Sequence, residues 1–166
     1  MPYQLQGLPQ EISESADYKA ARDAALKEAN APLAESFMSP SISVLARPSG
    51  YWNNTGIYKP KGIILVVSCI GGSWRSNPYW GPTDGAGDAR YIARVGYLRS
   101  GAPEGALIAK IGGDSVGGGS ETFAIGNYGF VSADLEGLLW LTVNDAPAGF
   151  GDNSGSLTVA VNIAGT

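Results

Sequence analysis

The feature that most constrains the fold is a series of short β-type segments from about residue 40 to the C-terminus. Clusters of Gly, Pro and Asn separate apolar runs rich in β-branched and aliphatic residues. In the last run, apolar residues alternate with Thr158, Ala160 and Asn162, which is the pattern of a half-buried strand. Many short strands with no helices between them predict an all-β sandwich. The runs cover residues 42–46, 63–70, 106–111, 138–143 and 157–163.

The N-terminal part has a different composition and predicts one helix over residues 13–31. Ser13 or Ser15 can cap its start, and Pro32 ends it. The segment is rich in alanine and would be marginally stable alone, so we expect it to pack on the domain, on another copy or on a partner. The sequence therefore predicts an N-terminal extension over residues 1–40 and a β-sandwich over residues 41–166.

Composition excludes several classes of function. The net charge of −4 argues against nucleic acid and anionic membrane surfaces, which attract clustered Lys and Arg. The chain has no histidine, which removes Ser-His and Cys-His catalysis and most zinc sites. Cys69 is the single cysteine, so there is no disulfide framework, and we expect it to be a buried, inert thiol.

The chain shows no sequence signal for membrane insertion or classical secretion. The longest apolar run, residues 63–67, is too short to span a bilayer. The first ten residues lack the basic start and apolar centre of a secretory signal. We expect synthesis in the cytoplasm without a classical signal peptide, followed by release or surface association by another route.

Two glycine-rich stretches are candidate sites. The stretch GGDSVGGGS, residues 112–120, has no following Lys and no flanking βα pattern, so it predicts a hairpin or loose loop rather than a phosphate cradle. The stretch NDAPAGFGDNSG, residues 144–155, gathers two carboxylates and two amides among small residues in a chain that is only 16% charged. Hard oxygens in such a loop suit Ca²⁺. An Asx-rich turn between two strands is the alternative, because Asp, Asn and Gly dominate turns.

A resemblance to a known family bears on that choice. VNDAPAGFGDNSGSLTVAVNI, residues 143–163, resembles the C-terminal signature of the PA-IL (LecA-like) family of calcium-dependent, galactose-binding bacterial lectins. YKPKGIILVVSCIGGSW, WGP, GALIAKIG and FAIGNYGF resemble further family motifs in the right order. The likeness covers residues 41–164 and implies a jelly-roll-like galactose-binding sandwich. The N-terminal helix has no counterpart in it.

The resemblance also implies a ligand set. It implies one Ca²⁺ that binds O3 and O4 of galactose directly. Asp145, Asp152 and Asn153 would supply side-chain oxygens, and Gly149 and Trp74 would supply backbone carbonyls. Asp145, Asp152 and Asn153 would also contact the sugar, together with Ala146.

The second wall of the implied sugar site departs from the family pattern. The family's type member uses a His, a Pro and a Gln after WGP, whereas residues 80–94 here hold neither His nor Gln. By position, Asp88 falls where it can accept a hydrogen bond from O6, and Tyr91 can stack on the sugar or its aglycone. Both can equally be ordinary exposed loop residues. We expect Trp80 and Trp140 to be core residues.

Three classes of function follow. The first is a lectin without catalysis that binds galactose-containing glycans and forms a homo-oligomer, a dimer or tetramer. The second is a glycosidase with Asp145 and Asp152 as its carboxylate pair, which is disfavoured because carboxylates that share a divalent cation shuttle protons poorly. The third is a structural or tail module of a larger assembly, in which Ca²⁺ locks a loop and sugar specificity is lost or altered.

Overall fold

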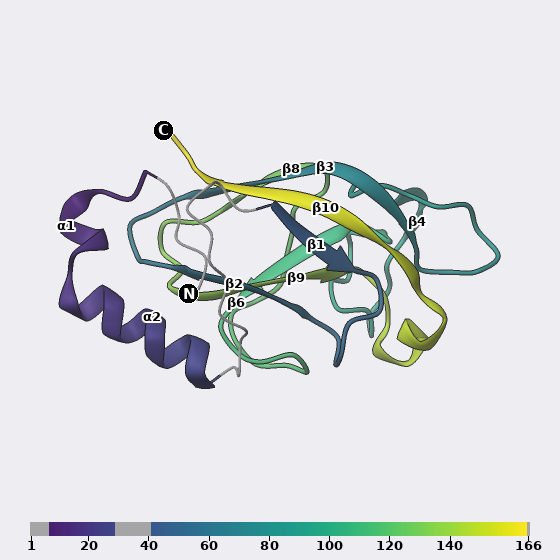
Figure 1. Ribbon diagram of the computed structural model, residues 1–166. Helices are drawn as coiled ribbons and strands as arrows, with labels where there is room; N and C mark the ends of the chain where they lie inside the picture. Colours follow the sequence, from purple (N-terminus) through teal and green to yellow (C-terminus); the bar gives the residue numbers. More distant parts are fainter. Residues whose placement is uncertain (1–6, 29–40, 166) are drawn as a thin grey trace.

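The computed structural model describes residues 7–28 and 41–165 and shows an all-β sandwich, as predicted (Figure 1). The described residues form two α-helices, ten β-strands and one 3₁₀ helix. They are α1 (Gln10–Ser13), α2 (Ala16–Glu28), β1 (Ser41–Leu45), β2 (Asn53–Lys59), β3 (Leu65–Arg75), β4 (Asp88–Ile92), β5 (Pro103–Glu104), β6 (Leu107–Ile111), β7 (Phe123–Ala124), β8 (Tyr128–Val131), β9 (Gly137–Val143), the 3₁₀ helix η1 (Pro147–Asp152) and β10 (Ser154–Ile163).

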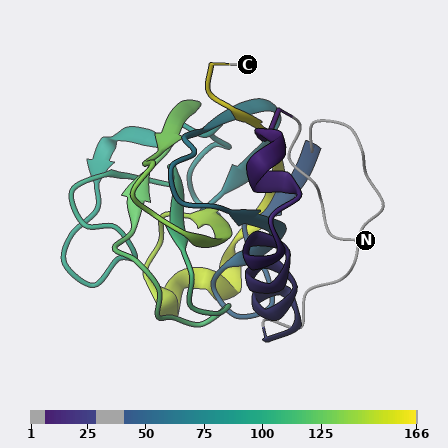
Figure 2. The same ribbon diagram turned by 90° about the vertical axis from the view of Figure 1, so that its left-hand side faces the viewer.

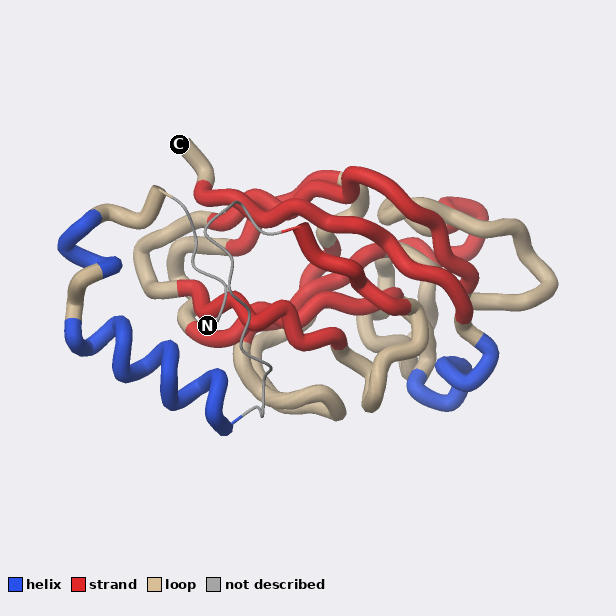
Figure 3. The backbone as a smooth tube through the Cα atoms, viewed as in Figure 1, coloured by secondary structure: helices blue, strands red, loops and turns tan. Residues whose placement is uncertain are grey.

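Two four-stranded antiparallel sheets form the layers of the sandwich (Figure 3). The first has the order β1-β10-β3-β8 and the second the order β2-β9-β6-β7. Strands β4 and β5 form a small separate ribbon. Neighbours in each large sheet are mostly far apart in sequence, so the C-terminal strand β10 lies between β1 and β3.

The core lies between the two sheets and follows the predicted alternation. In β10, Leu157, Val159, Val161 and Ile163 are all buried, which confirms the face expected from their spacing. They pack in one cluster with apolar residues of the second sheet, such as Leu141. At about 25 cal/mol per Å² of buried apolar surface, burial of such side chains is the main force that joins the layers.

Strand β2 was not predicted, because its sequence NNTGIYK lacks an apolar alternation. Two of its polar residues, Asn53 and Thr55, are buried and bonded to the backbone of neighbouring strands. The Asn53 amide donates to the carbonyls of Leu45 and Leu141, and the Thr55 hydroxyl donates to that of Leu139. Tertiary hydrogen bonds thus replace the apolar pattern on which sequence reasoning depends.

The N-terminal region forms two helices where one was predicted. Ser15 lies in the break between α1 and α2, and its hydroxyl accepts from the backbone N–H of Tyr18. Tyr18 and Leu26 of α2 are buried, and Figures 1 and 2 show α2 lying beside β2 and β9. The helix therefore packs on the domain itself. The expected end at Pro32 lies outside the described residues, and no described helix is long and apolar enough to cross a membrane.

The glycine-rich loop 112–120 joins β6 to β7 and is organised around a cation. The Lys110 ammonium donates to the carbonyls of Asp114, Gly117 and Gly118 and lies 5.0 Å from the centre of the Trp52 ring. Carbonyl oxygens directed at a cation are the opposite of a phosphate cradle, so the predicted hairpin loop is confirmed.

Cys69 in β3 is half-buried rather than buried as predicted. A bulge in the pairing of β10 with β3 adjoins it, between Thr158 and Val159. Its thiol faces the carbonyl of Gly71 at 3.7 Å.

Candidate functional site

The loop between β9 and β10 lies at the end of the sandwich remote from α2 (Figure 3). Its middle forms η1, with Pro147 at the first turn, where a missing N–H costs nothing. Because β9 and β10 belong to different sheets, this loop crosses from one layer to the other. Residues at both of its ends are therefore held by rigid strands.

Asp145 is the central side chain of this loop and is only 3% exposed. Its Oδ1 accepts the backbone N–H of Ala146 at 2.8 Å, whereas its Oδ2 is buried with no hydrogen-bond partner. Burial raises the pKa of Asp145 to about 6, the Ala146 N–H and the Asn153 amide oppose that rise, and the charges of Glu104 and Asp152 add to it. Such an environment favours either a proton or a cation on this carboxylate.

Asn153 presents a second oxygen of the same kind. Its Nδ2 donates to the carbonyl of Ala46 at 3.0 Å, which fixes the orientation of the amide. Its Oδ1 is consequently directed away from that bond, and it too is buried without a partner. Asp152, the preceding residue, is exposed at the loop surface.

The backbone of Gly149 lies directly against Asp145. A Cβ at position 149 would be 3.0 Å from Asp145 Oδ1 and 3.1 Å from Oδ2. Any side chain at this position would therefore crowd the carboxylate. Glycine, which has no side chain, lets the backbone of residue 149 lie close to the Asp145 carboxylate without a steric clash.

Trp74 comes from the adjacent layer, at the end of β3. Its backbone pairs with Gly155 of β10, and its carbonyl accepts the N–H of Thr83 at 2.9 Å. Gly155 has φ +86, and a Cβ there would come within 2.5 Å of Ser73 O, so only glycine permits this close approach. The Trp74 indole is buried and donates to Gly105 O at 2.8 Å.

These residues fit a calcium ion. The donor set combines carboxylate, amide and backbone carbonyl oxygens, the ligands that Ca²⁺ prefers. Two of the oxygens, on Asp145 and Asn153, are buried without partners, and a bound cation would satisfy both. No cluster of three or more His, Cys, Asp or Glu side chains that could hold a metal ion occurs among residues 7–28 and 41–165.

Asn144 belongs to the framework of the loop rather than to its donors. It is fully buried; its Oδ1 accepts the N–H of Arg99, and its Nδ2 donates to the carbonyls of Arg99 and Pro103. Of the four polar side chains first considered, only Asp145, Asp152 and Asn153 are therefore available as ligands. Asn144 ties the start of the loop to residues 99–103.

The two residues expected to form the second wall, Asp88 and Tyr91, both lie in β4 and both have partners within the protein. Asp88 in β4 binds Arg90 through both carboxylate oxygens, at 3.0 and 2.7 Å, and this pair holds the pKa of Asp88 below its usual range. Tyr91 stacks on Trp80 with ring centres 3.9 Å apart and planes inclined by 7°. Trp80 is half-exposed, so its expected place in the core is wrong, whereas Trp140 is buried as predicted.

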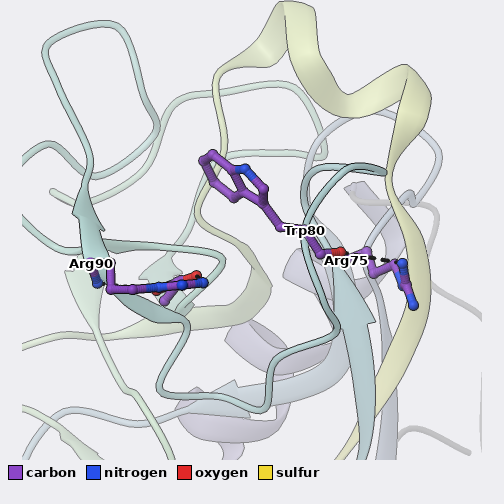
Figure 4. Close-up of polar contacts among 4 residues, drawn as sticks. Arg75, Trp80 and Arg90 are labelled. Carbon is purple, nitrogen blue, oxygen red and sulfur yellow. Dashed lines mark hydrogen bonds and ion pairs between the residues drawn. The ribbon is translucent and has the colours of Figure 1, made fainter.

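Figure 4 shows how the loop that carries Trp80 is held. The backbone carbonyl of Trp80 accepts from the Arg75 guanidinium at 3.2 Å, and the Trp80 indole extends away from Arg75. Arg90 lies on the other side of the indole in this view. The loop carbonyl is thus fixed to β3, while the ring stacks on Tyr91 and lines a surface hollow.

Comparison with known proteins identifies the family of this chain. A family model described as PA-IL-like protein matches residues 41–166. The chain belongs to the PA-IL-like family. It is also similar to a solved structure described as "EclA N-terminal domain; PllA-like lectin", at 25% identity and a TM-score of 0.53, over 74% of this chain and 94% of that chain. The PA-IL-like family and this lectin neighbour support a carbohydrate-binding lectin, and they confirm the family resemblance.

Sequence reasoning missed one polar residue beside the loop of this PA-IL-like chain. Glu104 in β5 is only 9% exposed, and its charge acts on Asp145. The only available signal was a lone acidic residue directly before a buried apolar strand. Such a residue is common at strand ends, so the sequence alone could not distinguish it.

Proposed function

We propose that this PA-IL-like chain is a calcium-dependent lectin that binds terminal galactose and galactosides. The observation that carries the proposal is the pair of buried, partnerless oxygens, Asp145 Oδ2 and Asn153 Oδ1, in one loop. A buried polar atom without a partner costs about 1–3 kcal/mol, and a cation at this position would remove that cost for both atoms.

The proposed ligand set is the one that the family resemblance implies. Asp145, Asp152 and Asn153 bind through side chains, and Trp74 and Gly149 bind through backbone carbonyls. A bound Ca²⁺ takes about 6–8 oxygens, so it would supply open positions for two hydroxyl groups. The hydroxyls O3 and O4 of galactose have a fixed spacing, and the axial O4 distinguishes galactose from glucose and mannose.

In this proposal, the protein groups around the ion also contact the sugar directly. Asp145, Asp152 and Asn153 accept hydrogen bonds from them, and Ala146 contacts the ring. The exposed edge of Tyr91 offers an aromatic surface beyond the metal. None of these roles requires a proton shuttle, so the proposal involves binding without turnover.

Calorimetry of Asp145→Ala tests the proposal. We expect loss of both calcium and galactose binding, because the variant removes the central buried carboxylate. Asp134→Ala is the matched control, since Asp134 is an exposed aspartate before the opposite end of β9 and is expected to bind as the wild type does. Normal galactose binding by Asp145→Ala would refute the metal site. Calcium binding by the wild type without any galactose binding would instead support the structural module.

We also propose that the chain acts as a homo-oligomer, a dimer or tetramer. A single shallow site binds weakly, and several linked sites gain avidity without new contacts. Light scattering is expected to report at least a dimer. A monodisperse monomer at high micromolar concentration would contradict this expectation.

A further inference from the structure

A hollow of about 570 Å³ is lined in part by β4 and β5, and the proposed calcium ligands are not among its lining residues. The stacked rings of Trp80 and Tyr91 line it, together with Tyr97 and Glu104. Two guanidinium groups, those of Arg90 and Arg94, also belong to the lining. The hollow therefore combines an aromatic surface with two cations and one buried carboxylate.

Two backbone hydrogen bonds attach the carboxylate side of the hollow to the metal loop. The N–H of Leu98, next to Tyr97, donates to Asp145 O at 3.1 Å. The N–H of Gly105, next to Glu104, donates to Asn144 O at 2.9 Å. Tyr97 and Glu104 are thus each one residue away from a direct bond to the start of the loop.

Glu104 is positioned as an acceptor. The side chain of Glu104 is only 9% exposed, and Tyr97 lines the same hollow. Burial raises the pKa of Glu104, Asp88 adds to this rise, and the Tyr97 hydrogen bond and Arg94 oppose it. A carboxylate has about four lone-pair sites, so one phenol leaves capacity for a ligand hydroxyl.

Asp88, by contrast, already accepts hydrogen bonds on both of its carboxylate oxygens. The Arg90 guanidinium contacts both of its oxygens, and the backbone N–H of Arg90 donates to Oδ1 as well. A sugar hydroxyl would have to displace part of this pair. Glu104 requires no such displacement, because no arginine contacts its carboxylate directly among the hydrogen bonds of the described residues.

We propose that Glu104, positioned by Tyr97, is a specificity-determining residue of the lectin site. It accepts a hydrogen bond from a ligand hydroxyl that flanks the chelated pair, either the 2-hydroxyl or the 6-hydroxyl of galactose. This inference rests on the proposed function. It adds a contact that depends on this chain's own glutamate and not on the metal.

The test compares three sugars, galactose, 2-deoxygalactose and 6-deoxygalactose, by calorimetry at saturating calcium. Wild-type protein is expected to bind one deoxy sugar about tenfold or more weakly than galactose, the effect of losing a hydrogen bond to a charged acceptor. In Glu104→Ala, the affinities for galactose and for that deoxy sugar are expected to become equal, so that their ratio falls to about one. Glu104→Gln keeps the shape and one acceptor and is expected to give an intermediate ratio.

Controls separate this contact from a structural role. Glu121→Ala removes an exposed glutamate that does not line this hollow and is expected to keep the wild-type ratio. Calcium affinity is measured for each variant, because a merely misfolded loop would lose calcium as well. Tyr97→Phe, which removes the orienting phenol, is expected to reduce the ratio while calcium binding persists.

The outcomes are distinct. If wild-type protein does not bind galactose, the proposed function fails. If it binds galactose and Glu104→Ala keeps the wild-type discrimination, the Glu104 inference alone is overturned. The same holds if neither deoxy sugar binds more weakly, or if Asp88→Ala and not Glu104→Ala abolishes the discrimination, which would restore the sequence-based assignment.

Discussion

Replacing Gly149 by alanine tests the proposed calcium site, because it displaces the proposed ligand Asp145 without changing any charge. The new Cβ would lie 3.0 Å from Asp145 Oδ1 and 3.1 Å from Oδ2, whereas ordinary contacts begin at 3.4 Å. The carboxylate must therefore shift by about 0.4 Å, the difference between 3.4 and 3.0 Å. Calcium–oxygen distances span only about 2.3–2.6 Å, so this shift exceeds the whole tolerated range.

We expect at least a tenfold loss of calcium affinity, which is about 1.4 kcal/mol. The metal-free protein is also expected to lose about 1–3 kcal/mol of stability, because Asp145 is buried and overpacking forces its neighbours to move. Isothermal calorimetry with Ca²⁺ measures the first effect, and urea denaturation in chelator measures the second.

Gly151→Ala is the matched control in the same 3₁₀ helix. A Cβ at position 151 meets no atom within 4 Å, and neither glycine has a positive φ, so backbone strain does not enter. This variant is expected to bind calcium as the wild type does. Equal calcium affinity of Gly149→Ala and Gly151→Ala would refute Asp145 as a ligand.

Three further predictions concern stability. Chelation of calcium is expected to lower the melting temperature by about 5–10 °C when the free ion was at 100 times its Kd, by linkage, and calorimetric scans with and without chelator check this. Asn144→Ala is expected to cost about 3 kcal/mol in urea denaturation, since it leaves buried backbone groups unpaired, whereas exposed Asn162→Ala should cost under about 0.5 kcal/mol. Burial lowers the pKa of Lys59 from 10.5 to about 8, below its unfolded value, so the unfolded chain holds the extra proton between these pH values. Stability is therefore expected to rise from pH 8 toward pH 10 by at most about 3 kcal/mol, and Lys59→Met should flatten this slope in urea titrations at several pH values.

Sequence patterns predicted the segments whose side chains alternate between core and solvent. The alternation in residues 157–163 fixed both the strand and its buried face, because a one-residue slip would expose every apolar side chain. Strand β2 escaped prediction because its buried polar residues are satisfied only by strands distant in sequence, as Asn53 is by Leu45 and Leu141.

The sequence by itself determined the content of the loop 144–155: its two carboxylates, its amides and its glycines are local, and they suit either a calcium site or an Asx-rich turn. Only the tertiary structure decided the use of each group. Asn144 is drawn into bonds with residues 99–103, while Asp145 and Asn153 keep buried free oxygens. The role of Glu104 also depends on which strands meet at the loop. Burial and orientation arise from contacts between residues distant in the chain, and local spacing carries no information about them.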